Sequence, residues 1–248
     1  MPVAMYFYFR KQKKADRMPF WIGCITFVLF ALVLEQLAYL PLTKMPFWKP
    51  LTSNVWLYGL LGGFMAGLFE ETGRFIAFKT VLRKKRGNDA NALMYGAGHG
   101  GIEAAILLGT TMIGNLIVAL QFNAGTAAPG AALDAAYMLM NTPPWLFLVG
   151  AIERFSAVAL HLSLSVLVWF AAKDGKRFWL YPLAILLHLI VDMVAVVLSG
   201  LGVNVWIIEA SVFLLAAALV VIAVVVWKKN HKPAEAEQPE ETPVEAQA

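Results

Sequence analysis

The sequence predicts an all-α membrane protein, a polytopic bundle of about six transmembrane helices with both termini in the cytoplasm. Of its 248 residues, 60% are hydrophobic and only 15% are charged, and the mean hydropathy is +0.67. A soluble domain usually contains about 45–50% apolar and about 25% charged residues. The apolar residues also occur in long runs, which a chain needs in order to cross a bilayer.

A transmembrane helix needs about 20 mostly apolar residues. The stretches that meet this requirement are 20–40, 55–80, 92–122, 144–171, 178–199 and 205–227. Lys and Arg cluster before the first stretch and after the second, fourth and sixth, whereas the other connections contain only Lys44 and Lys49. Because basic connections stay in the cytoplasm, this alternation predicts cytoplasmic termini.

Two parts of the chain differ in composition. Residues 1–230 form the predicted transmembrane domain, and residues 231–248 form an acidic, proline-rich tail that we expect to be disordered in the cytoplasm. The net charge of +4 reflects the basic connections, so we expect no nucleic-acid partner. The single cysteine, Cys24, allows no internal disulfide.

Ionisable residues at helical spacing interrupt the apolar stretches. A charge at the bilayer centre costs roughly 2.5–3.5 kcal/mol, so such residues are expected to face one another or a wet cavity. The groups are Glu70-Glu71-x-x-Arg74, His99-x-x-x-Glu103, Glu153-Arg154 with His161 downstream, and His188-x-x-x-Asp192. Their depths in the predicted spans are compatible, which predicts one polar cavity shared by several helices.

Glycines accompany two of these groups. Gly59, Gly63 and Gly67 recur every four residues, so another helix is expected to approach this face closely. Four glycines surround His99, which indicates a close approach of backbone or substrate there. In contrast, Glu35 lies toward the outer end of its stretch and is expected to reach the membrane interface, as is Glu209.

Carboxylates and histidines in a wet cavity favour hydrolysis of a peptide bond, with one group activating water and another stabilising the oxyanion. Arg74 is positioned to neutralise one of the two adjacent carboxylates and leave the other free. The chain has no Gly-x-Ser-x-Gly or His-Glu-x-x-His motif, which disfavours serine and zincin-type mechanisms. Two other functions stay open: a proton-coupled transporter and a non-enzymatic receptor or peptide-immunity protein.

These motifs resemble those of the YhfC family of membrane peptidases. The matching segments are Glu70–Arg74, Gly98–Glu103, Glu153-Arg154 with His161 downstream, and His188–Asp192. More distantly they are similar to the PrsW and CAAX-processing glutamate-type intramembrane proteases. The resemblance implies a protease of the bacterial inner membrane that is surrounded by membrane lipid. Its substrate would be a membrane protein or a peptide.

The resemblance also implies roles for individual residues. Glu70 would be the general base with His99, and His188 with Asp192 would stabilise the oxyanion. Glu71 and Arg74 would position the base, although Glu71 and Glu103 stay open as alternative bases. The expected catalytic residues are therefore Glu70, Glu71, His99, Glu103, His188 and Asp192, with Arg74, Glu153, Arg154 and His161 in support.

We expect a mechanism that uses no metal ion, because the resemblance is to glutamate-type proteases and because no two histidines share one helical turn. The alternative is a zinc ion held by His99, His188 and Glu103, a His-His-carboxylate set with an open position for water. The sequence does not predict the oligomeric state or the identity of the substrate.

Overall fold

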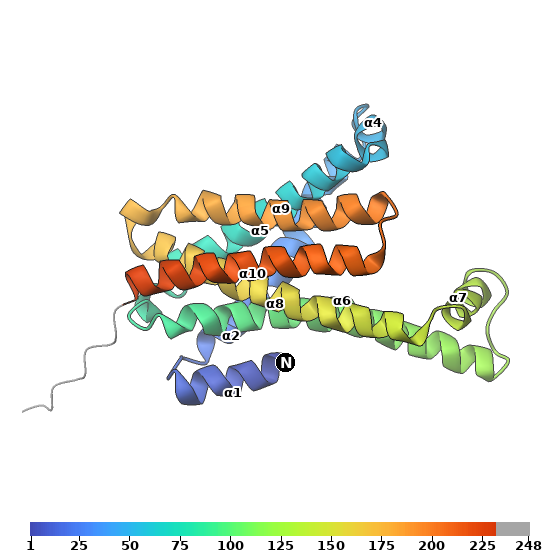
Figure 1. Cartoon of the computed structure of the whole chain (residues 1–248), viewed down its shortest axis with the longest axis horizontal. Helices are drawn as coiled ribbons and strands as arrows, with labels where there is room; N and C mark the ends of the chain where they lie inside the picture. The colour runs from blue at the N-terminus through green and yellow to red at the C-terminus, as the bar shows by residue number, and fades with distance from the viewer. Residues whose placement is uncertain (232–248) are drawn as a thin grey trace, which may run out of the picture.

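The computed structural model describes residues 1–231, which form helices joined by short connections (Figure 1). Apart from His231, the predicted acidic tail lies outside the described residues. In chain order the elements are α1 (Pro2–Gln12), α2 (Met18–Phe27), the π-helical segment η1 (Val28–Glu35), α3 (Gln36–Leu42), α4 (Trp48–Ser53), α5 (Val55–Lys79), η2 (Arg83–Lys85), α6 (Ala90–Asn123), α7 (Ala131–Met140), α8 (Pro144–Lys173), η3 (Gly175–Arg177), α9 (Leu180–Gly200) and α10 (Val205–Asn230).

The polytopic helical bundle predicted from the sequence is confirmed. Within the described residues, the segments long and apolar enough to cross a membrane are Met18–Leu42, Ala90–Asn123, Pro144–Lys173, Gly175–Gly200 and Val205–Asn230. The remaining predicted stretch corresponds to α5, which is 25 residues long but less apolar because it carries Glu70, Glu71 and Arg74. It packs against α9 and η1 within the bundle.

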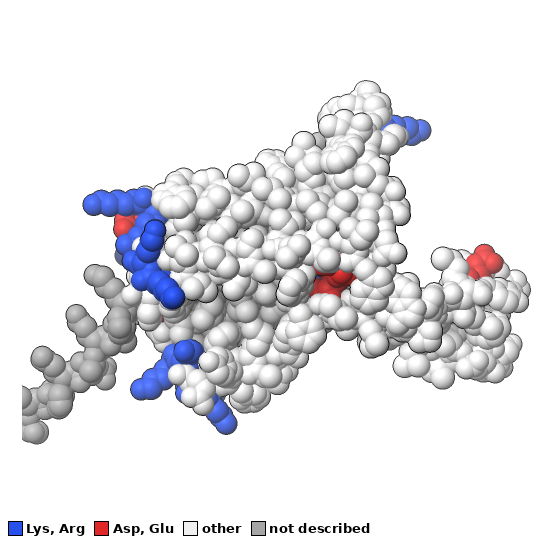
Figure 2. Space-filling model, viewed as in Figure 1, with Lys and Arg blue, Asp and Glu red and all other residues white. Residues whose placement is uncertain are grey.

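Basic side chains gather at one end of the bundle, where α10 ends (Figures 1 and 2). The last turns of several helices supply them, including Lys79 of α5, Lys173 of α8 and Lys228 of α10. A smaller basic group lies near α4 at the other end (Figure 2). By the positive-inside rule, the end of the bundle with more Lys and Arg faces the cytoplasm. The cytoplasmic location of the termini remains a prediction.

The glycine face of α5 packs directly on α9, as the spacing predicted. A Cβ added to Gly63 would lie 2.5 Å from the carbonyl oxygen of Leu189. A Cβ on Gly67 would lie 2.8 Å from the carbonyl oxygen of Ile185, and one on Gly59 would lie 2.8 Å from the Cγ2 atom of Val197. The absence of side chains here brings α9, with His188 and Asp192, close to the helix that carries Glu70.

The glycines around His99 let two other helices approach α6. A Cβ on Gly98 would lie 1.9 Å from the carbonyl oxygen of Phe20 in α2. On another face, Cβ atoms on Gly96 and Gly100 would lie 3.0 Å from the carbonyl oxygen and 3.1 Å from the Cβ of His161, respectively. The glycine density therefore serves backbone packing, and it places α8 and His161 beside His99.

The basic N-terminal stretch, predicted only as a connection, contains the short helix α1. Phe9 of α1 packs with Met94 and Ala97 of α6. At the start of the helix, Pro2 lies so close to α6 that a Cβ on Gly101 would be 2.5 Å from the proline Cβ. This helix was missed because its apolar run is too short to be recognised as a membrane span.

Candidate functional site

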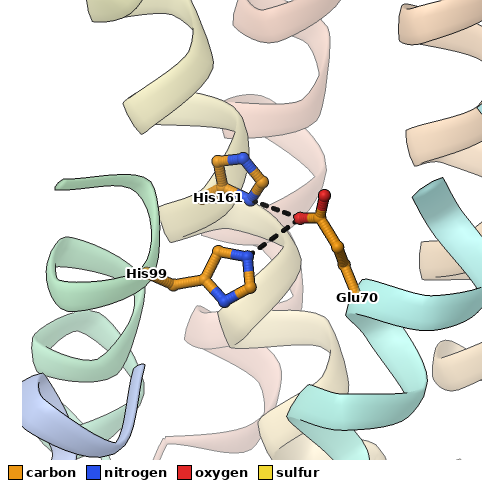
Figure 3. Close-up of side chains that lie close together, drawn as sticks. All are labelled: Glu70, His99 and His161. Atoms are coloured by element: carbon orange, nitrogen blue, oxygen red, sulfur yellow. Dashed lines mark hydrogen bonds and ion pairs between the residues drawn. The ribbon is translucent and has the colours of Figure 1, made fainter. Parts of the chain in front are cut away.

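Three buried side chains from three helices converge inside the bundle: Glu70 of α5, His99 of α6 and His161 of α8 (Figure 3). His99 Nε2 lies 2.9 Å from Glu70 Oε2, and His161 Nδ1 lies 3.9 Å from the same oxygen. The centroids of the two imidazole rings are 4.8 Å apart. One potential ligand atom from each residue therefore faces a common point.

His161 is oriented by groups on both sides of its ring. Its Nε2 contacts the carboxylate of Glu103. Its Nδ1 lies 3.1 Å from Nη2 of Arg74, a permanent donor, so Nδ1 acts as the acceptor. Nε2 is therefore the protonated nitrogen, and the lone pair of Nδ1 accepts from Arg74. A metal ion bound to Nδ1 would replace that hydrogen bond, in the neutral tautomer that metals require.

The second carboxylate of the Glu-Glu pair belongs to a closed ionic network. Arg74 Nη1 donates to both oxygens of Glu71, at 2.6 Å for Oε1, and both side chains are fully buried. His188 Nδ1 lies 2.9 Å from Glu71 Oε1. The predicted neutralisation of one carboxylate by Arg74 therefore applies to Glu71, which also ties α5 to α9.

Glu103 does not pair with His99, although the two lie one helical turn apart. Arg154 Nη1 donates to Glu103 Oε1 at 3.1 Å, and Arg154 Nε donates to Glu153 Oε2 at 2.7 Å. The local Glu153-Arg154 ion pair expected from the sequence is thus present. It also extends to α6, where Arg154 holds the carboxylate that contacts His161.

A cavity of about 560 Å³ opens beside this cluster, and its lining includes Glu70, Glu103, His161, His188 and Asp192. His188 Nε2 lies 3.5 Å from Asp192 Oδ2, and the Asp192 side chain keeps 36% of its surface accessible. On the face shown in Figure 2, acidic atoms appear at one spot in the otherwise uncharged middle of the bundle. The predicted shared cavity is present, and each of the three predicted pairs contributes to its lining, but Glu71 and His99 do not line it.

A larger cavity of about 810 Å³ lies between α1, α6, α8 and α10. Its walls are mostly apolar, with Lys13, Lys14 and His231 at its edge. Neither Glu70 nor its two histidine neighbours line it, so size alone does not locate the chemical site.

The donor set of Glu70, His99 and His161 fits a catalytic zinc ion. Such sites commonly have three protein ligands, two histidines and one glutamate among them, and keep the fourth position for water. Bonds of about 2.1 Å in a tetrahedron place neighbouring ligand atoms about 3.4 Å apart, and the separations of 2.9 and 3.9 Å from Glu70 Oε2 bracket that value. The contact between His161 and Glu103 is the usual support of a ligating histidine.

Comparison with known proteins identifies the family of this chain. The model of a family described as "YhfC intramembrane metalloprotease" matches residues 1–212. The chain belongs to the YhfC family. It is 33% identical over 210 residues to a Bacillus subtilis (strain 168) protein named "Uncharacterized membrane protein YhfC", covering 79% of each chain. No solved structure matches it significantly.

Membership of the YhfC family supports a multi-pass membrane protein and, in general, a membrane protease. The word metalloprotease in the family description favours the zinc alternative over the metal-free mechanism expected from the sequence. One reason for that expectation was the likeness to glutamate-type proteases, and the other was the separation of the histidines along the chain. Folding removes this obstacle, because His99 and His161 meet across the α6–α8 contact.

The ligand set also differs from the zinc alternative considered for the sequence. That set contained His99, His188 and Glu103, whereas the structure groups His99 with Glu70 and His161. His188 is instead held by Glu71. A usable signal for His161 was present in Gly96 and Gly100, whose missing side chains mark the face of α6 against which α8 packs.

Two further carboxylates reach the cavity. Glu35, expected at the membrane interface, is only 8% exposed and lines the cavity wall. Glu209 of α10, expected at the interface as well, also lines it. The interpretation of Glu35 was wrong because depth along a predicted span does not show which side of the helix faces the bundle.

Proposed function

We propose that this protein is a metal-dependent intramembrane protease whose metal ligands are Glu70, His99 and His161. The observation that supports this proposal is the convergence of these three buried side chains inside a membrane helix bundle, where Glu70 and His161 also line a cavity. A zinc ion bound there would lower the pKa of a bound water and polarise the carbonyl of the scissile peptide bond.

The remaining residues of the site position groups and move protons. Glu103 fixes the His161 tautomer that carries its proton on Nε2, so that Nδ1 would bind the metal in place of its hydrogen bond from Arg74, and Arg154 holds Glu103 in place. His188 has a carboxylate beside each ring nitrogen and can donate a hydrogen bond toward the cavity, where charge develops on the peptide carbonyl oxygen. Glu71 fixes the orientation of that ring.

Asp192 is the carboxylate of this group best placed to exchange protons with the cavity. Its side chain is 36% accessible, compared with 0% for Glu71 and 12% for Glu103. We assign it the proton that leaves the attacking water, which the departing amine takes up when the C–N bond breaks. In this assignment Glu70, one of the bases considered for the sequence, is a ligand.

The test compares new peptide N-termini in membranes from cells that produce the wild type, Glu70→Gln, His161→Ala or Asp89→Asn at matched protein levels. Asp89 lies outside the cavity and serves as the control for loss of a buried carboxylate. We expect cleavage sites with the wild type and Asp89→Asn that are absent from the other two, and we expect chelation to abolish them and zinc to restore them. Identical N-termini in all four samples would contradict the proposed activity.

A further inference from the structure

Glu35 is a buried carboxylate that the proposed chemistry does not use. It is the last residue of η1, and only 8% of its surface is exposed. Its side chain lines the same cavity as Glu70 and His161. Within residues 1–231 its carboxylate has no hydrogen-bond or ion-pair partner, although His188 and Asp192 line the same cavity.

The backbone at Glu35 is as unusual as its side chain. The first membrane-spanning segment changes from α-helix to π-helix over Val28–Glu35 and returns to α-helix at Gln36. π-helical segments are rare, and they occur frequently at functional sites. Because η1 packs on α5, this distortion occurs against the helix that carries Glu70.

More carboxyl groups than basic side chains line the cavity. Among residues 1–231, the one arginine that lines the cavity is Arg154, which is already shared by Glu103 and Glu153. Within the described residues, Glu35 and Glu209 have no cationic partner. The carboxylates that line the cavity are Glu35, Glu70, Glu103, Glu153, Asp192 and Glu209. An unpaired carboxylate in a buried position is costly, so a positive group from outside would be favoured there.

The wall around Glu35 is suited to a long basic side chain. Ala31 and Leu32 of η1 line the cavity on the same element, and Val191 lines it from α9. Lys and Arg place an aliphatic stem against such apolar groups and a charged head against a carboxylate. A small apolar substrate side chain would leave Glu35 unpaired.

We infer that Glu35 forms a subsite for a Lys or Arg side chain of the substrate, close to the scissile bond. This inference rests on the proposed protease function and adds a substrate class to it. Glu35 determines specificity in this account, and it neither binds the metal nor contacts the reacting atoms. Loss of the Glu35 carboxylate should therefore change the choice of cleavage site. It should have a smaller effect on the rate at which sites without a Lys or Arg side chain are cut.

The experiment uses the purified full-length protein in detergent with zinc and a proteome-derived peptide library, with cleavage sites identified by mass spectrometry. The variants are Glu35→Gln, Glu35→Lys and, as a matched loss of charge elsewhere on the cavity wall, Glu209→Gln. For the wild type we expect Lys and Arg to be enriched at one fixed position relative to the cut bond. Glu35→Gln should reduce cleavage of those sites about tenfold relative to neutral sites.

The charge-reversed variant distinguishes a substrate-binding role of Glu35 from a purely structural one. Glu35→Lys should move the enrichment at that position to Asp and Glu, whereas Glu209→Gln should keep the preference for Lys and Arg. A wild type that cleaves without basic enrichment, a Glu35→Gln variant that retains it, or an equal loss in Glu209→Gln would overturn the subsite and leave the protease intact. Absence of cleavage in every sample, with zinc present, would overturn the proposed function and the subsite together.

Discussion

Two clusters of buried ionisable groups lie in this bundle, and they differ in how completely they are paired. At its basic end, Asp89 accepts from Trp169 Nε1 at 2.8 Å and from Lys173 Nζ at 2.5 Å, and its other oxygen lies 2.9 Å from His231 Nδ1. This cluster joins the start of α6 to the ends of α8 and α10. The other cluster, around Glu70, joins the middles of α5, α6 and α8.

The Glu70 cluster is incompletely paired. Buried side-chain atoms without a hydrogen-bond partner among the described residues include Nδ1 of His99, Nε of Arg74 and the hydroxyl of Tyr95, which all lie in or beside it. It also borders the 560 Å³ cavity, which no member of the Asp89 cluster lines. A buried charge that is fully paired at a helix end stabilises the fold, whereas one left partly free beside a cavity is available for ligands and chemistry.

The largest difference between the clusters should appear in activity. Glu70→Gln removes a charged ligand without a change in side-chain shape, and we expect hydrolysis to fall about 10³-fold or more. Asp89→Asn should leave the rate within about threefold, because Asp89 does not line the cavity. Initial rates on one cleaved peptide measure both, and equal losses in the two variants would remove the distinction.

A smaller effect is expected for Glu103, which supports the proposed site through His161. Because groups that orient a ligand typically affect metal affinity by about 10–100-fold, Glu103→Gln should weaken zinc binding by that factor. Competition with a fluorescent chelator measures the affinity. Glu153→Gln is the control, since Glu153 contacts the same Arg154 and makes no contact with His161. Unchanged affinity in Glu103→Gln would show that the contact with His161 does not support a ligand.

The α5–α9 contact offers a change that affects the site through packing alone. Gly63→Ala would place a Cβ 2.5 Å from the Leu189 carbonyl oxygen, so we expect a loss of stability of about 1–3 kcal/mol and lower activity as α9 moves away. At Gly62, on the same helix, nothing lies within 4 Å of the added Cβ. Gly62→Ala should therefore be neutral or stabilising, and a thermal melt of each variant in detergent tests the pair.

Substitution of Asp89 should have the smallest effect on activity and a clear effect on stability. Burial works to raise the pKa of Asp89, but hydrogen bonds from Lys173, Trp169 and His231 outweigh it and lower the pKa below its usual 3.8. The ionised form then stabilises the fold above that pH, and this contribution is lost as the pH falls through the lowered pKa. Asp89→Asn should cost about 2 kcal/mol at pH 7.

Thermal melts across pH test the sign of this contribution. The difference in melting temperature between the wild type and Asp89→Asn should be constant near neutral pH and shrink below about pH 4. A difference that grows on acidification would contradict the assignment of Asp89 as a stabilising, ionised group.

The sequence revealed the chemical groups more completely than their partners. Glu70, His99 and His188 stood out because charge within an apolar stretch is costly and therefore informative. Which carboxylate each histidine meets depends on contacts between helices, so the pairing of His99 with Glu70 could not be read from spacing. The same limit applies to His161, whose nearest polar partners lie on α5 and α6.

Other features depended on the fold in different ways. The packing of Gly63 against another helix was predictable because small residues at a four-residue repeat let the backbones of two helices approach closely. The π-helical turn that ends at Glu35 has no sequence signature in this chain, and α1 is too short for a hydropathy window. Local pattern thus identified the membrane bundle and most of its polar residues, while packing decided which of them form the site.

The central claim is that Glu70, His99 and His161 hold a metal ion, and metal content tests it most directly. The wild type, His161→Ala and Asp89→Asn would be purified, supplied with zinc, freed of excess and measured by elemental mass spectrometry. We predict about one zinc per chain in the wild type and in Asp89→Asn, and close to none in His161→Ala. A wild type without bound zinc, or a His161→Ala variant that retains it fully, would contradict the account.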